Sequence, residues 1–258
     1  MGPLQQRYVS KELTHFVGKG KAQEEQYRLL LTILRSGELR ADPNCAPGAR
    51  IISGRTNFGA ARFSERQTYH FPGVCFCDIP LADLEIHARK FSCFGIAFRR
   101  RFLVDRGASP VFYIARDSRI SPAPCDRLGI EDREYTRREF FDSIFPRVNG
   151  LCSDLVLQSR ALAIGNAGAP SELVALAQGI AEINTYLTEY VYSYCVSFDA
   201  NSDDADEEHF YMEREWRVLD DVQFALRDVE RLIVPRAFGE RIRHDLLDFC
   251  GQTNFLDL

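Results

Sequence analysis

The stretch VCFCDIP at residues 74–80 determines how the rest of this 258-residue chain is interpreted. Its first four residues are valine, phenylalanine and two cysteines, a short apolar run typical of a buried strand. Asp78 stands where a helix cap is expected, and Pro80 suits the first turn of the helix that follows. The stretch therefore predicts a central strand followed by a helix that runs to about Phe91.

Further strand patterns lie on both sides of this stretch. They are expected at residues 12–16, 50–53, 94–98, 110–114, 215–219, 222–226 and 231–234. A helix is expected at residues 23–35, with Gly37 as its C-terminal stop. Strands in both terminal parts with helices between them favour an α+β fold with a mixed or antiparallel sheet.

The middle of the chain has a helical pattern. Apolar residues recur at helical spacing over residues 136–163 and again over residues 171–195. A glycine-rich turn between them predicts a long antiparallel helical hairpin. We therefore expect this hairpin, at residues 136–198, to be inserted between two halves of an α+β core, residues 1–135 and 199–258.

Composition restricts the class of protein. The chain is 45% hydrophobic and 27% charged, with a net charge of −5, which is ordinary for a soluble globular protein. No apolar run is long enough to span a membrane, and the N-terminus lacks the apolar core of a secretion signal. Eight cysteines without a CxxC pair favour reduced thiols in a cytoplasmic protein and predict no metal site.

The common catalytic motifs are absent from the sequence. There is no P-loop, no GxGxxG, no GxSxG and no HxxxH pair. These absences exclude the commonest NTPases, Rossmann dehydrogenases, α/β-hydrolases and zincins. A nuclease that uses carboxylates on a metal lacks an obvious cluster of acidic ligands.

Two polar positions beside the apolar strands are candidates for function. His15 lies within the strand pattern at residues 12–16, and His87 follows Asp78 by nine residues on the expected helix. A buried polar group needs a partner or a purpose. Each candidate also has a structural explanation: a half-buried histidine for His15, a helix cap for Asp78 and a surface position for His87.

A third candidate is the stretch FYMEREWRVL at residues 210–219. Alternation along a strand would place four polar side chains on one face: Tyr211, Glu213, Glu215 and Arg217. Two carboxylates and a guanidinium on one face could hold a ribose hydroxyl or stabilise a developing cation. The alternative is a surface ladder of Glu–Arg pairs, which contributes little. Arg55, which lies between two glycines, could clamp a phosphate or simply be solvated.

Five ordered motifs resemble the AbiGi-type abortive-infection family. They are LTHFVG at 13–18, VCFCDIPL at 74–81 with His87, FGIAF at 94–98, PVFY at 110–113 and FYMEREWRV at 210–218. The resemblance spans almost the whole chain. It implies bacterial phage defence in a toxin–antitoxin setting, with a cognate toxin, antitoxin or phage protein as the partner.

The chain also bears a more distant resemblance to the ADP-ribosyltransferase superfamily. Members place a histidine or arginine on an early strand, an aromatic residue or serine on a second strand and a glutamate on a late strand. The resemblance implies NAD as substrate, with His15 and either Glu213 or Glu215 as catalytic residues. It assigns substrate or NAD binding to Arg55, Phe76, Asp78, His87 and Arg217. Cys75 departs from the pattern, because a stacking tyrosine is expected there.

Two functions follow from these resemblances. A transferase would move ADP-ribose from NAD to nucleic acid or protein, and its site would bring together His15, Asp78, Glu213, Glu215 and Arg217, with Arg55 at the rim. A non-enzymatic antitoxin or phage sensor would instead bind its partner through the helical hairpin. The second function predicts an exposed apolar stripe along residues 171–195.

Overall fold

The computed structural model describes residues 10–41, 72–115, 154–155, 157–158, 171–203 and 209–257. The chain divides into two compact units. Unit 1 combines Met1–Arg50, Pro72–Val111 and Phe210–Leu258, and unit 2 combines Ile51–Phe71 and Phe112–His209. Within the described residues, no helix is long and apolar enough to cross a membrane.

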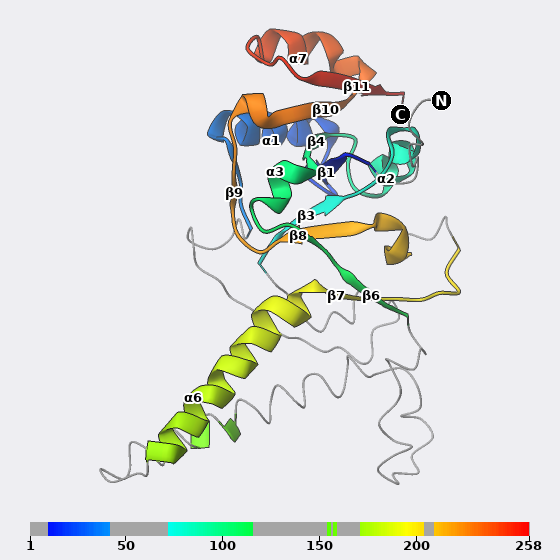
Figure 1. Ribbon diagram of the computed structural model, residues 1–258. Helices are drawn as coiled ribbons and strands as arrows, with labels where there is room; N and C mark the ends of the chain where they lie inside the picture. Colours follow the sequence, from blue (N-terminus) through cyan, green and yellow to red (C-terminus); the bar gives the residue numbers. More distant parts are fainter. Residues whose placement is uncertain are drawn as a thin grey trace, which may run out of the picture. The chain divides into compact units, whose positions relative to one another are not determined.

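Unit 1 is built on a seven-stranded sheet with the strand order β11-β10-β4-β1-β3-β8-β5 (Figure 1). Its strands are β1 (Glu12–Phe16), β3 (Val74–Cys77), β4 (Gly95–Arg99), β5 (Ser109–Pro110), β8 (Glu215–Val218), β10 (Val229–Pro235) and β11 (Gln252–Leu256). Neighbouring strands are antiparallel except β10 and β11, which are parallel. The prediction of an α+β fold with a mixed or antiparallel sheet is confirmed, and the sheet is mostly antiparallel.

Four helices accompany this sheet in the described part of unit 1: α1 (Gln23–Ser36), α2 (Leu84–Lys90), α3 (Arg100–Val104) and α7 (Gly239–Asp245). The predicted stop of α1 is confirmed, since Gly37 adopts a left-handed conformation with φ 68°. A Cβ atom at Gly37 would also collide with the carbonyl oxygen of Phe224, so the turn requires glycine. A short two-stranded ribbon, β2 (Glu38–Leu39) with β9 (Val222–Gln223), follows that turn.

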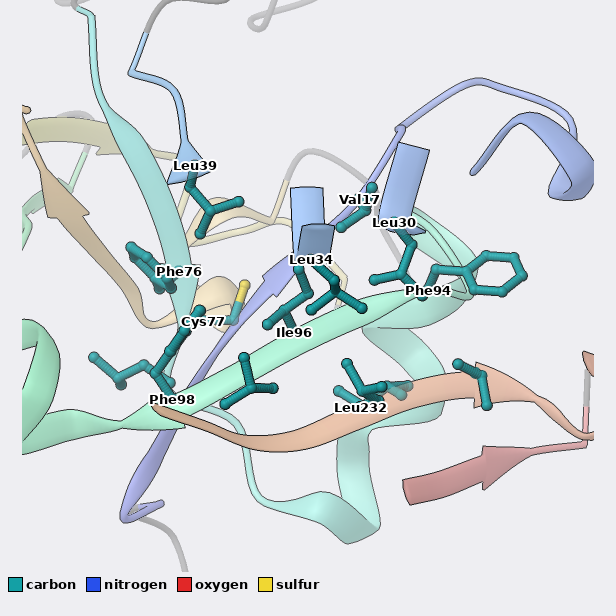
Figure 2. Close-up of a cluster of buried hydrophobic side chains, with 14 of the residues drawn as sticks. Val17, Leu30, Leu34, Leu39, Phe76, Cys77, Phe94, Ile96, Phe98 and Leu232 are labelled. Carbon is teal, nitrogen blue, oxygen red and sulfur yellow. The ribbon is translucent and has the colours of Figure 1, made fainter. Parts of the chain in front are cut away.

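One face of the sheet carries the hydrophobic core. Paired residues on neighbouring strands share a face, and the register pairs Leu13 with Phe98 and Ile96 with Leu232. All four side chains are fully buried, as is Leu30 of α1, which belongs to the same cluster (Figure 2). Burying one such side chain contributes roughly 1.5–3 kcal/mol, so this layer holds the sheet and α1 together.

The opposite face of the sheet is polar where β1, β3 and β8 adjoin. The register places Thr14 opposite Cys77, and Cys77 in turn opposite Glu215. Arg217 lies opposite Cys75 on the same face. Because side chains alternate along a strand, this polar face lies on the other side of the sheet from Leu13.

Unit 2 contains a parallel strand pair and one long helix among its described residues. The strands are β6 (Phe112–Ala115) and β7 (Cys195–Phe198). The helix α6 (Ser171–Tyr186) continues into a π-helical turn, Leu187–Val191, and a 3-10 turn, Tyr192–Tyr194. The second helix of the predicted hairpin thus begins at Ser171 as expected.

Several boundaries differ from the prediction. The strand expected at residues 110–114 is divided between β5, which pairs with β8, and β6, which pairs with β7. The strand expected at 222–226 is only the two residues of β9. Most of the first helix of the hairpin and the strand at 50–53 lie outside the described residues. The hairpin and the domain boundaries near residues 136 and 198 therefore stay predictions.

Candidate functional site

The predicted strand at residues 210–219 is shorter than alternation suggested. Residues Phe210–Glu213 form a 3-10 turn, and Arg214 adopts a left-handed conformation with φ 45°. The strand β8 begins only at Glu215, so the single face predicted for four polar residues is wrong for Tyr211 and Glu213. Tyr211 is exposed, whereas Glu213 is buried.

Glu215 and Arg217 keep the predicted alternation and form a buried ion pair. The Nε atom of Arg217 lies 2.7 Å from Oε1 of Glu215, and Nη2 lies 3.0 Å from Oε2. A planar guanidinium suits this two-point contact with a carboxylate. Two charges are tolerated inside a protein only with such geometry. The predicted Glu–Arg ladder is therefore present as one pair, but it is buried and not on the surface.

Glu213 forms a second buried ion pair, with Lys90 at the end of α2. The ammonium nitrogen lies 2.8 Å from Oε1 of Glu213 and also lies over the rings of Phe91 and Phe210. Burial raises the pKa of the Glu213 carboxyl, and the attraction of Lys90 opposes this shift. The neighbouring charge of Glu215 raises the same pKa further. The two carboxylates thus act on each other electrostatically.

We name Lys90, Glu213, Glu215 and Arg217 the carboxylate cluster. Cys77 is electrostatically coupled to it, and burial, followed by the charges of Glu213 and Glu215, raises the pKa of its thiol well above the usual range. A thiol that stays protonated is a poor nucleophile. Among the described residues, no three histidine, cysteine or acidic side chains are placed to hold a metal ion.

His15 lies on the other face of the sheet from the Glu215–Arg217 pair. Its neighbour Thr14 shares a face with Cys77, so alternation turns His15 toward the ring of Phe76, 5.8 Å away between centroids. The Nδ1 atom donates to the carbonyl oxygen of Cys75 at 2.8 Å. Burial lowers the pKa of His15, and this hydrogen bond only partly offsets the shift. The ring is a half-buried, hydrogen-bonded histidine.

Asp78 joins separate segments of unit 1. Its Oδ1 accepts from the backbone amide of Ser10 at 2.8 Å, and its own amide donates to the carbonyl oxygen of Arg214. Its Oδ2 lies 3.7 Å from Arg100 and 3.5 Å from Arg214. The predicted helix cap is wrong, because the next helical turn begins at Leu81 without a side-chain cap. Asp78 instead fixes the start of β1 beside the turn at Arg214.

His87 and Phe76 are both buried. The His87 ring packs parallel to Phe91, and within the described part of the chain its Nδ1 atom has no hydrogen-bond partner. Burial, reinforced by Lys90, lowers the pKa of His87 to about 4. Its charged neighbours are Lys90 and Asp83, and the alternative of a surface position for His87 is wrong. Phe76 is fully buried in the core, where its ring meets Phe98 edge-on.

The predicted site residues therefore fall into separate groups. Glu213, Glu215 and Arg217 belong to one cluster, while His15 lies across the sheet. Arg55 lies outside the described residues. Sequence reasoning missed Lys90, because nothing local links it to a glutamate 123 positions later. A lysine in the last turn of a helix is usually an ordinary surface residue.

A family model matches residues 52–240, which is well over half of the chain. Its description is "Putative abortive phage resistance protein AbiGi, antitoxin". No curated protein and no solved structure matches the chain. The matched residues include the carboxylate cluster and α6 but not His15, and nothing found supports the resemblance to ADP-ribosyltransferases. The chain belongs to the AbiGi family of abortive phage resistance proteins.

Proposed function

We propose that this protein is the antitoxin of a phage-defence pair and that it acts by binding its partner protein through α6. The observation that carries this proposal is a series of large apolar side chains exposed to solvent along the helix and its π-helical turn. They are Leu176 (60% exposed), Ile183 (59%), Tyr186 (60%) and Tyr190 (53%). We name these four residues the apolar stripe.

The spacing of the apolar stripe supports one continuous contact surface. Leu176 and Ile183 are seven residues apart, so they lie on the same side of the helix two turns from each other. Tyr186 follows Ile183 by three positions, and its ring lies 5.9 Å from that of Tyr190. Exposed contiguous apolar surface marks interaction sites, and tyrosines are frequent anchors in them.

The test is neutralisation of the toxin in growing cells. The double variant Leu176→Asp/Ile183→Asp is co-expressed with the cognate toxin, and growth is compared with the unaltered chain. We expect neutralisation to be lost, because the two new carboxylates would be buried in the interface without a hydrogen-bond or ion-pair partner. The matched control is Gln178→Asp, which places a carboxylate at an exposed position on another side of α6. Full neutralisation by the double variant would overturn the proposal.

An ADP-ribosyltransferase with NAD as substrate is the second candidate function. What supports it is the raised pKa of Glu213 beside a second carboxylate, since perturbed carboxyl groups cluster at catalytic sites. In that reaction the bond between nicotinamide and ribose breaks, and a nucleophile of a protein or nucleic acid bonds to the ribose carbon. Glu213 or Glu215 would stabilise the cationic transition state without His15.

Nicotinamide release separates the two candidates. The purified protein is incubated with NAD and an extract of phage-infected cells, beside the variants Glu213→Gln and Glu215→Gln. A transferase predicts nicotinamide release by the unaltered chain and its loss in a variant that circular dichroism shows to be folded. Intact NAD in every sample would exclude the transferase and leave the antitoxin proposal standing.

A further inference from the structure

The stretch of sequence that begins with α6 is strongly acidic. Residues 171–208 contain nine aspartates and glutamates and no lysine, arginine or histidine. The whole chain has 37 acidic and 32 basic residues, so 28 acidic and 32 basic residues remain outside this stretch. The net negative charge of the protein therefore comes entirely from the segment that contains the apolar stripe.

Two of these acidic residues lie beside the apolar stripe. Glu182 is exposed and lies directly before Ile183, four residues before Tyr186. On a helix, residues four apart are neighbours on the surface. Glu189 is half-buried and lies in the π-helical turn that continues α6, next to Tyr190 of the stripe. We name Glu182 and Glu189, the neighbours of Ile183 and Tyr190 in the sequence, the acidic margin of the stripe.

We propose that the partner surface bound by α6 is basic: an apolar centre with a margin of lysine and arginine side chains. The inference rests on the proposed function of α6 as the binding element. Charge of opposite sign speeds association and excludes wrong partners, whereas like charges across an interface are costly. Nucleic acid and anionic membranes are repelled by the same margin. The partner is therefore a protein with a positively charged binding surface.

Two designed helical peptides test this inference with the full chain. Both present the same leucine face, and one is flanked by lysines while the other is flanked by glutamates at the same positions. Binding is measured by fluorescence anisotropy at low and high salt. We expect the lysine peptide to bind about tenfold more tightly at low salt, from two charge pairs together. The preference is expected to shrink at 1 M salt, where screening acts over about 3 Å.

Two variants separate the sources of binding. Glu182→Lys/Glu189→Lys is expected to reverse the preference between the peptides, and Leu176→Asp/Ile183→Asp is expected to abolish binding of both. Equal binding of the two peptides, lost only in the second variant, would overturn the basic partner while leaving α6 as a docking element. Failure to bind either peptide would overturn this inference without bearing on toxin neutralisation.

A second copy of the chain is the remaining alternative occupant. Its signature would be a dimer in light scattering that Leu176→Asp/Ile183→Asp converts to a monomer, with neither peptide able to compete. That result would overturn the basic partner, because the stripe would be covered by the protein itself.

Discussion

The carboxylate cluster of unit 1 and the apolar stripe of α6 are opposite exceptions to the usual distribution of side chains. The cluster buries three charged residues and most of the Lys90 side chain, and the stripe exposes four large apolar ones. Inside the cluster, each carboxylate has a cation within 3 Å. The charges of the cluster are thus paired within the chain, whereas the apolar side chains of the stripe are exposed to water.

This difference separates stability from binding. A buried ion pair contributes little net stability but becomes costly when one partner is removed, because the other charge stays buried. An exposed apolar side chain contributes little to folding, so it can be changed at almost no cost. We therefore expect substitutions in the cluster to destabilise the fold and substitutions in the stripe to affect only the binding of its partner.

The largest effect is expected from Glu215→Gln. This change removes the carboxylate that holds the buried guanidinium of Arg217 at two atoms. The free energy of unfolding in urea should fall by about 3–5 kcal/mol. The control is Glu230→Gln. The partner of Glu230 is the exposed Arg99, so losing this ion pair should not shift the urea midpoint of unfolding. Equal midpoints for both variants would contradict the contrast between the two regions.

A smaller loss is expected from Asp78→Asn. The amide of asparagine keeps one of the two acceptor oxygens. It loses the negative charge that faces Arg100 and Arg214. The free energy of unfolding should fall by about 2 kcal/mol. Asp83→Asn, at an exposed position before α2, serves as the control. An unchanged free energy of unfolding in Asp78→Asn would show that Ser10 and Arg214 are held by other contacts.

The pH dependence of stability should report His87. Its pKa falls from 6.5 to about 4 on folding, so the unfolded chain takes up the proton first as pH decreases. Stability is fully present above pH 6.5 and is lost between there and about pH 4, by roughly 2 kcal/mol after allowance for partial solvation. His87→Gln should flatten this part of the profile in urea unfolding at several pH values. A profile that His87→Gln leaves unchanged would show that another group titrates there.

The smallest effect on folding is expected from Ile183→Ser in the apolar stripe. Its side chain is 59% exposed, so the free energy of unfolding should change by less than about 0.5 kcal/mol. The same variant should weaken toxin neutralisation in the growth assay. A large loss of stability would show instead that the stripe is part of a folded core.

The sheet was predictable because its signals are local. Alternation gave the faces of Glu215 and Arg217, and a glycine at position 37 marked the end of α1. The pairing of Lys90 with Glu213 was not predictable, since it depends on the turn at Arg214. A left-handed backbone at an arginine has no sequence signal, because glycine and asparagine are the residues expected there. A missed turn changes the direction of every side chain before it.

The pairing of β3 with β8 has a consequence for how the protein is synthesised. Val74 lies opposite Val218, so β3, from the first third of the chain, can pair only after β8, from the last quarter, has been synthesised. During translation β1, β3 and β4 are complete long before β8 leaves the ribosome. Until then one edge of β3 has unpaired amides and carbonyls, the kind of edge on which chains aggregate. Production of the full chain should therefore benefit from slow synthesis or from chaperones more than its ordinary composition suggests.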